Sequence, residues 1–362
     1  MQVIAGDGRG GADRVALALG KALRALGHRV SYVVRPSFLL NHNLHAMGYD
    51  VVTYPEKASE RRDFMRAARK VDVLLTHDSG SRHLALRAKL FGMQTPVWFM
   101  RHCISGTSRF GGTLLHRLLV ARQLAISDVV TQSLLDAGYP AARVHRLYGS
   151  VDLTPFLHPD EQTVKTVRQR WLSDVGVDVL IIGIVARFNI YAGWTPQKID
   201  LKGYDTLFAA LSKFNRPYRV LVVGPRDAQD HDALRQMAAH YGADPQNLIF
   251  LGFVQDMAPI YKLMQVNVLP SRNEGLGLSV IEGMAAGVAS IASRSGGLIE
   301  IVRDEENGLS FDVDDANALA HCLNRLADDH ELRTLLARNG QSDVLERFDV
   351  RSLAHSVLDL MQ

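Results

Sequence analysis

Short apolar segments alternate with longer segments of helical pattern along almost the whole chain. Runs such as 71–77 and 96–100 are short and largely apolar, as expected for strands that are buried on both faces. The run 179–185 consists mainly of branched residues and is typical of a central parallel strand. Strands that alternate with helices favour βαβ units, so the pattern predicts an α/β protein with parallel sheets.

Glycine, proline and polar residues mark the boundaries of these segments. We predict strands at 2–5, 29–34, 71–77, 96–100, 179–185, 219–223, 248–251, 265–270 and 288–292, and helices at 12–26, 81–91, 113–124, 203–211, 230–241, 259–264, 278–286, 316–328, 331–339 and 350–361. The alternation stops at 152–160, where Pro155 and Pro159 predict a linker, and then begins again. A chain of 362 residues can form two domains with separate cores, and we place their boundary at residue 155.

Composition limits the classes of protein to consider. The chain is 47% hydrophobic and 22% charged, as in soluble globular proteins. It has no apolar run of the roughly 20 residues that a membrane helix needs, and its first residues predict a strand rather than a signal peptide. Cys103 and Cys322 are too few for a disulfide framework or a metal cluster, so we expect a cytoplasmic protein.

Charge is distributed unevenly between the two halves. The net charge is only +3, but residues 1–155 hold 21 Lys and Arg against 11 Asp and Glu, a net of +10, and the remainder carries −7. A basic half suggests an anionic partner such as a membrane surface, a phosphorylated lipid or nucleic acid. An inert surface explains the asymmetry equally well.

Candidate chemistry concentrates at 271–287, which reads S-R-N-E-G-L-G-L-S-V-I-E-G-M-A-A-G. A strand, a glycine-containing turn and a helix N-terminus together favour anion binding through free N–H groups and the helix dipole. Gly275 and Gly277 allow a ligand to approach the backbone. Glu274 can accept hydrogen bonds from sugar hydroxyls, and Glu282, one turn into the helix, can bind a ribose diol. Two solvated glutamates on an ordinary strand–turn–helix unit are the alternative.

This run resembles the donor-site signature of the retaining GT-B glycosyltransferases of family 4. The resemblance implies that Glu274 contacts the donor sugar and that Glu282 holds the nucleotide ribose. It also implies a retaining hexosyltransferase whose donor substrate is a UDP- or GDP-linked sugar and which needs no cofactor. We expect the loop to line the same site with Gly275, Leu276, Gly277 and Leu278.

Two cations match those that bind the donor phosphates in this family. Arg187 follows the predicted strand 179–185, and Lys202 opens the predicted helix 203–211. Arg offers a two-pronged donor and Lys a mobile point charge, and both would stabilise the charge that develops on the leaving diphosphate. No metal is then required, and the sequence has no D-x-D at a strand end and no His cluster with ligand spacing.

The segment 188–201 departs from the family pattern because the gap is usually much shorter. It contains Phe188, Tyr191 and Trp194, which are residue types that stack on sugars. The segment is a lid, an acceptor platform or a passive surface loop. Lys198 within it competes with Lys202 for the role of the phosphate lysine.

The first half offers two further candidates. The loop 6–11 lacks the dinucleotide spacing, and no acidic residue ends the second strand, so we do not expect an NAD site. It resembles the G-G-A-x-R-V opening of the same family, which makes Gly10 and Gly11 candidates for the donor phosphates and acceptor; a structural tight turn is the alternative. His102 lies just past the strand 96–100, where open α/β sheets bind ligands. In the family a His at this place lines the pocket under the reacting sugar, although a lone His is more often a packing residue.

The resemblance implies the GT-B fold, with two Rossmann-like domains facing across a cleft. We expect an acceptor domain at 1–155, a donor domain at 156–345 and a closing helix at 346–362 that returns to the first domain. The segments 125–130 and 144–148 resemble the last two strands of the first domain. Retention at the anomeric carbon would follow from front-face attack, with the departing phosphate helping to take the acceptor proton.

We therefore predict a glycosyltransferase that builds lipopolysaccharide or exopolysaccharide on a glycan or lipid-linked acceptor. The alternatives are a GT-B sugar-nucleotide epimerase, a phosphorylase or an inactive partner subunit. The basic segments 61–70 and 109–122 predict salt-reversible, peripheral contact with anionic lipid at the inner face of the cell membrane, and no nucleic acid partner. Arg122 falls within the apolar stripe of the second segment, which also fits ordinary packing of that helix on the sheet.

Overall fold

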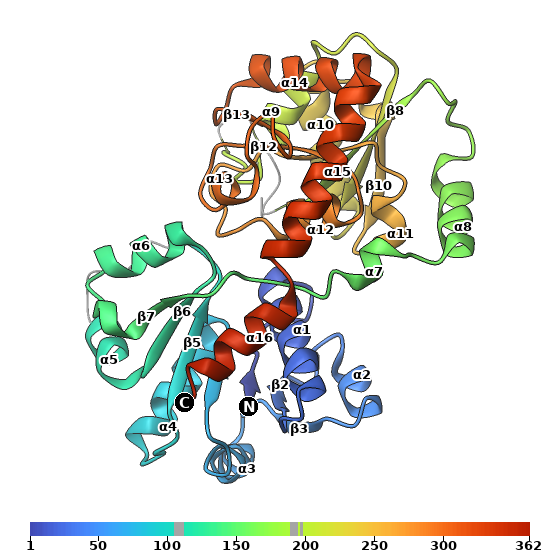
Figure 1. Cartoon of the computed structure of the whole chain (residues 1–362). Helices are drawn as coiled ribbons and strands as arrows, with labels where there is room; N and C mark the ends of the chain where they lie inside the picture. Colours follow the sequence, from blue (N-terminus) through green and yellow to red (C-terminus); the bar gives the residue numbers. More distant parts are fainter. Residues whose placement is uncertain (105–111, 189–194, 196–197) are drawn as a thin grey trace. The chain divides into compact units, whose positions relative to one another are not determined.

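The computed structural model describes all residues except 105–111, 189–194 and 196–197. The chain forms two compact units (Figure 1). Unit 1 comprises Met1–Asp152 and Phe348–Gln362, and unit 2 comprises Leu153–Arg347. Each unit has its own sheet, so each can be described by itself.

The sheet of unit 1 is parallel throughout its described part, with strand order β3-β2-β1-β4-β5-β6-β7. Its strands are β1 (Gln2–Val3), β2 (Ser31–Val34), β3 (Asp50–Thr53), β4 (Leu74–Thr76), β5 (Val97–Arg101), β6 (Arg122–Ala125) and β7 (Val144–Arg146). Its helices are α1 (Gly11–Ala25), α2 (Asn41–Ala46), α3 (Ala58–Ala68), α4 (Ser79–Leu90), α5 (Gly112–Leu119), α6 (Asp128–Asp136) and α16 (Val350–Asp359). Helices join successive parallel strands, as the alternation predicts.

The core of unit 1 lies on both faces of this sheet. Because strand residues alternate between faces, Val3 and Ile4 enter different clusters. Val3 packs in a cluster with Phe64 of α3, and Ile4 packs with Ala16 of α1. Helix α16 lies along α1 (Figure 1). The prediction that the C-terminal helix returns to the first domain is therefore confirmed.

The sheet of unit 2 is also parallel, with strand order β10-β9-β8-β11-β12-β13 among the described residues. Its strands are β8 (Leu180–Val185), β9 (Tyr218–Val223), β10 (Leu248–Gly252), β11 (Val266–Leu269), β12 (Ala289–Ser293) and β13 (Leu309–Phe311). Its helices are α7 (Thr154–Leu157), α8 (Glu161–Leu172), α9 (Tyr204–Leu211), α10 (Ala228–His240), α11 (Ala258–Tyr261), α12 (Leu278–Ala285), α13 (Leu298–Ile301), α14 (Ala316–Asp328) and α15 (His330–Arg347). The predicted α/β class with two Rossmann-like domains is confirmed.

Two predictions near the end of unit 1 are wrong. The helix predicted to reach residue 124 ends at Leu119, and Arg122 instead begins β6. Arg122 lies over the ring of Trp98 on the neighbouring strand, 5.3 Å from its centroid, so its cation stabilises a strand pairing rather than a helix surface. The strand predicted at 125–130 is also misplaced, because Ser127 caps α6 by accepting from the N–H of Val130.

We predict that Gly203→Ala destabilises unit 2 much more than Gly252→Ala. Both glycines have positive φ, at 74° and 67°, which costs any other residue about 1–2 kcal/mol. A Cβ at Gly203 would lie 2.0 Å from the carbonyl oxygen of Pro270, whereas at Gly252 the nearest atom is 3.9 Å away. Urea unfolding of both variants measures the difference. Equal losses of unfolding free energy in the two variants would mean that the Pro270 backbone moves away from the new Cβ without lowering stability.

Candidate functional site

The loop between β11 and α12 is packed tightly against its neighbours in unit 2. Gly277 caps α12 with φ 108°, and a Cβ there would lie 2.4 Å from Leu298. The N–H of Gly297 donates to the carbonyl of Glu274 at 2.9 Å, and a Cβ on Gly297 would lie 2.4 Å from the carbonyl oxygen of Gly275. The glycines at 275, 277, 296 and 297 therefore allow the connection after β11 to contact the connection after β12. This fixes the backbone that carries Glu274.

The structure brings two of the expected site residues together. Lys202 Nζ lies 2.5 Å from Glu274 Oε2, and the two side chains are 21% and 18% exposed. Lys202 precedes α9 and Glu274 follows β11, so the pair joins two connections at the carboxyl edge of the sheet. A cation and a carboxylate that both remain accessible at this edge could each turn to a ligand.

A buried carboxylate shapes the turn that presents Lys202. Asp200 is 1% exposed and accepts hydrogen bonds from the N–H of Tyr204 at 2.8 Å and of Lys202 at 3.2 Å. Burial raises the pKa of Asp200, against these hydrogen bonds, which lower it. The Tyr204 hydroxyl donates to the carbonyl of Ala186 at 2.8 Å, which ties the start of α9 to the end of β8.

Arg272 braces the same turn and is a residue that the sequence analysis did not single out. Its guanidinium forms a two-pronged contact with Asp205, both distances 2.8 Å, and its Nε lies 2.6 Å from Asp314. It also donates to the carbonyl of Asp200. The only sequence signal for this role was the Arg in the S-R-N-E-G run, because its planar guanidinium can bridge several acceptors at once.

The other phosphate candidates are surface residues in the structure. Arg187 follows β8 by two residues and is exposed, and Lys198 is exposed near the end of the unusual segment. Tyr191 and Trp194 lie outside the described residues. Phe188 is 2% exposed and packs edge-on against Tyr204, with ring centroids 5.7 Å apart. The suggestion that Phe188 stacks on a sugar is therefore wrong, because its ring belongs to the core.

Glu282 is completely buried in this conformation. The Tyr261 hydroxyl lies 3.3 Å from its Oε2 and donates to the Ser279 carbonyl at 2.9 Å. Phe156 in turn packs edge-on against Tyr261, with centroids 5.8 Å apart. A ribose can reach the Glu282 carboxylate only if some of this cover moves. Leu276 is likewise 1% exposed, so only its backbone can serve a ligand.

The glycine loop of unit 1 already uses part of its backbone. The N–H groups of Gly8 and Gly10 donate to Asp13 Oδ2 at 3.0 and 3.1 Å. Asp13 is 5% exposed, and burial raises its pKa. The N–H of Gly10 is thus engaged by the chain's own carboxylate, while Gly11 begins α1 and is exposed. The role of Asp13 was missed, since one acid in a helical pattern carries no signal.

His102 contacts a second histidine that was also missed. His77 Nδ1 lies 3.1 Å from His102 Nε2, and the rings are 5.4 Å apart at their centroids. Burial lowers the pKa of His102 to about 3, so the ring is neutral at pH 7. Burial, followed by the neighbouring His102, also lowers the pKa of His77. Nearby, Asp78 Oδ2 accepts from the N–H of Ala5 at 2.8 Å, which joins the ends of β1 and β4.

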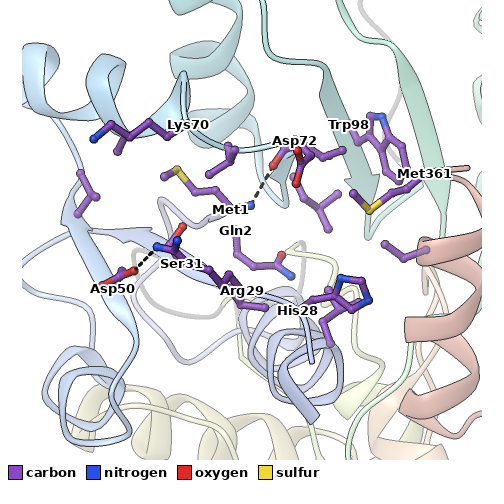
Figure 2. Close-up of a pocket in the computed structure, with 18 of the residues that line it drawn as sticks. Met1, Gln2, His28, Arg29, Ser31, Asp50, Lys70, Asp72, Trp98 and Met361 are labelled. Atoms are coloured by element: carbon purple, nitrogen blue, oxygen red, sulfur yellow. Dashed lines mark hydrogen bonds and ion pairs between the residues drawn. The ribbon is translucent and has the colours of Figure 1, made fainter. Parts of the chain in front are cut away.

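A cavity of about 650 Å³ lies elsewhere in unit 1 (Figure 2). Its lining includes Arg29 and Asp50, an ion pair at 3.6 Å, together with Lys70, Trp98 and Met361. None of the expected site residues lines it. Within the described ranges, no group of three His, Cys, Asp or Glu is placed to hold a metal ion, and no helix is long and apolar enough to cross a membrane.

Comparison with known proteins adds to this geometry. A model described as Glycosyltransferase Family 4 matches residues 9–154, and one described as Glycosyl transferases group 1 matches residues 189–329. The structure of Anabaena HepE in complex with UDP-glucose superposes with a TM-score of 0.84 at 19% identity, covering 99% of this chain and 98% of that one. The chain has the GT-B fold of glycosyltransferases.

Curated relatives of this GT-B chain match over part of their length. The lipopolysaccharide core biosynthesis glycosyltransferase LpsE of Rhizobium meliloti is 29% identical over 163 residues, 45% of this chain and 47% of that protein. The putative glycosyltransferase EpsD of Bacillus subtilis is 34% identical over 145 residues, 40% of this chain and 38% of that protein. The chain thus spans less than half the length of these two relatives in the matched regions.

We predict that acid destabilises unit 1 in part through His102. Below pH 6.5 the unfolded chain binds a proton that folded His102, with its pKa of about 3, does not bind. The contribution of His102 to the free energy of unfolding is therefore complete above pH 6.5. It falls as the pH decreases toward 3, by up to about 1.4 kcal/mol per pH unit. Hydrogen exchange of β4 and β5 between pH 7 and 5 measures the slope.

In His102→Asn this slope should decrease, and in the exposed control His28→Asn it should not. An unchanged slope in His102→Asn would mean that folded His102 takes up its proton as readily as the unfolded chain does.

Proposed function

We propose that the chain is a glycosyltransferase that moves a sugar from a nucleoside-diphosphate sugar to a glycan acceptor in polysaccharide biosynthesis. The observation that carries this proposal is the Lys202–Glu274 pair at the carboxyl edge of the unit 2 sheet. Strand order reverses between β8 and β11, and the connections after these two strands are where open α/β sheets bind ligands. The name of LpsE, a lipopolysaccharide core biosynthesis glycosyltransferase, supports the pathway, and the name of EpsD, a putative glycosyltransferase, supports the reaction.

The donor would bind to unit 2 and change the partner of Lys202. A diphosphate brings two or more negative charges, so we propose that Lys202 turns from Glu274 to the phosphates, with Arg187 as a second cation. Glu274, released from Lys202, then accepts hydrogen bonds from hydroxyls of the donor sugar. The loop from Gly275 to Leu278 would contact the diphosphate through its backbone, and Glu282 would bind the ribose after its cover moves.

The transfer step needs stabilisation of the leaving group more than a strong nucleophile. The bond between the anomeric carbon and the phosphate oxygen breaks, and the electron pair stays on the diphosphate beside Arg187 and Lys202. The acceptor hydroxyl forms the new bond, and its proton passes to the departing phosphate. We propose retention of configuration, no requirement for a metal ion, and an acceptor site in unit 1 near His102 and Gly11.

The function is tested with donors and nucleotides directly. Thermal shift with UDP, GDP, ADP and CMP should single out one nucleotide that stabilises the protein, because only a ligand of the folded state raises its melting temperature. With the matching nucleotide sugar and a polysaccharide precursor as acceptor, nucleoside diphosphate should be released in the presence of EDTA. Conversion of the donor to an epimer without such release would support a sugar-nucleotide epimerase instead.

We predict that Lys202→Ala lowers kcat/KM by an amount equivalent to roughly 2–4 kcal/mol of transition-state stabilisation, as for other lost electrostatic donors. The matched control is Lys198→Ala, which should remain close to wild type. Glu274→Gln should reduce transfer but keep or improve nucleotide affinity, since it removes the competitor for Lys202. Full activity in Lys202→Ala with loss in Lys198→Ala would move the phosphate contact to Lys198.

We also propose peripheral contact between unit 1 and anionic lipid, since precursors of surface glycans are commonly lipid-linked. The cations of α3 and the turn after it are all exposed: Arg61, Arg62, Arg66, Arg69 and Lys70. In the second basic segment, 109–122, two cations already have partners within unit 1, because Arg117 donates to the Ala137 carbonyl and Arg122 donates to His145. This segment therefore supports lipid contact less than α3 does. Arg109 and Phe110 lie outside the described residues.

We predict that Arg61→Gln with Arg62→Gln weakens binding to anionic vesicles about thirtyfold, at about 1 kcal/mol per cation near the surface. The control, Lys165→Gln with Arg168→Gln on α8 of unit 2, removes the same charge from exposed positions and should have no effect. Co-sedimentation at low and high salt measures both. Equal binding to neutral vesicles, or equal losses in the two double variants, would leave the charge of α3 without a membrane role.

A further inference from the structure

Three polar side chains follow one another across the central strands of unit 1. Gln2 of β1 stands opposite Leu75 of β4, which stands opposite Trp98 of β5. Residues alternate between the faces of a sheet, so His77, two positions beyond Leu75, lies on the same face as Gln2. His102 follows β5 directly. A hydrogen-bonded row thus runs from β1 through the end of β4 to the end of β5.

With the Gln2 amide oxygen toward His77, the two contacts in this row favour one set of proton positions. Gln2 Oε1 lies 2.5 Å from His77 Nε2, and a carbonyl oxygen only accepts, so Nε2 carries the hydrogen. A neutral imidazole has one N–H, which leaves His77 Nδ1 as an acceptor. His102 Nε2, 3.1 Å away, must therefore donate to it. The lone pair of His102 is then on Nδ1.

Both rings must be neutral for this arrangement, and burial keeps them so. Gln2 and His77 are each 2% exposed, and burial lowers the pKa of both histidines. Two adjacent imidazolium ions would also repel each other. His102 alone of the three is partly exposed, so it is the member of the row that a ligand can reach.

We propose that His77, anchored by Gln2, is a positioning residue that holds His102 as the neutral Nε2–H tautomer, so that His102 Nδ1 accepts a hydrogen bond from a substrate hydroxyl. The proposal rests on the proposed function of unit 1 in glycosyl transfer. The ligand group that faces His102 Nδ1 is then a hydroxyl, which can donate a hydrogen bond, rather than a phosphate or carboxylate oxygen, which only accepts one. Neither His77 nor Gln2 touches substrate.

Nitrogen NMR of the full chain labelled with ¹⁵N-histidine tests the tautomer without any substrate. Of the 14 histidines, His102 is assigned by its loss in His102→Asn. In the wild type we expect a protonated Nε2 and an unprotonated Nδ1 at His102, with the same pattern at His77. The opposite tautomers, which a reversed Gln2 amide would produce, would overturn the proposal.

Variants separate positioning from packing. Gln2→Met keeps the size of the side chain but leaves His77 free to exchange tautomers, so the His102 nitrogen signals should move toward an average of the two forms. His77→Leu removes the acceptor, whereas His77→Asn retains an oxygen for His102 Nε2–H and should restore the wild-type pattern. Unchanged His102 signals in both Gln2→Met and His77→Leu would overturn the proposal.

Kinetics then connects the tautomer with transfer. His77→Leu should lower kcat about tenfold, the scale of one lost hydrogen bond, with KM for the nucleotide sugar unchanged, and His77→Asn should recover most of the loss. Full activity in His102→Asn would overturn the substrate contact. An absence of transfer in the wild type with every donor would instead contradict the proposed function, and the NMR result would still decide the tautomer.

Discussion

Parallel strands all end at the same edge of a sheet, and this constraint determines where the candidate site residues of both units lie. In each sheet the order of strands reverses at one place, between β1 and β4 in unit 1 and between β8 and β11 in unit 2. In open α/β sheets the connections at such a point leave in opposite directions, and this is where ligands bind. The glycine loop and His77 follow the first pair of strands, and Arg187 and Glu274 follow the second.

Charged and polar groups at these edges pair with one another within the chain. Lys202 is paired with Glu274, and the loop amides of Gly8 and Gly10 are paired with Asp13. An unpaired charge or N–H group in a partly buried place would cost free energy, so these pairings stabilise the two units. Any anion that binds at either edge must then replace interactions rather than add to them. Its binding free energy is the difference between the two sets of contacts.

Sequence patterns could predict most of the fold and some of the candidate site. The strand–helix alternation and the run from Ser271 to Gly287 depend on local residue types, and both appear in the structure as expected elements. Arg122 was misassigned because its partner, Trp98, is distant in sequence and lies on another strand. Phe188 was misjudged for a similar reason, since its burial depends on Tyr204 across an atypical segment. Local patterns do not contain such pairings.

The residues that position Lys202 and His102 were the hardest to predict from the sequence, and they share a physical role. Arg272 fixes the turn of Lys202 through Asp200 and Asp205, and the row from Gln2 through His77 fixes the ring of His102. Each acts from a neighbouring connection rather than from the site itself. A reacting group is effective only when its orientation is settled before the substrate arrives, because orientation at that moment would cost entropy. The buried polar contacts around Lys202 and His102 therefore orient these two side chains as well as stabilise each unit.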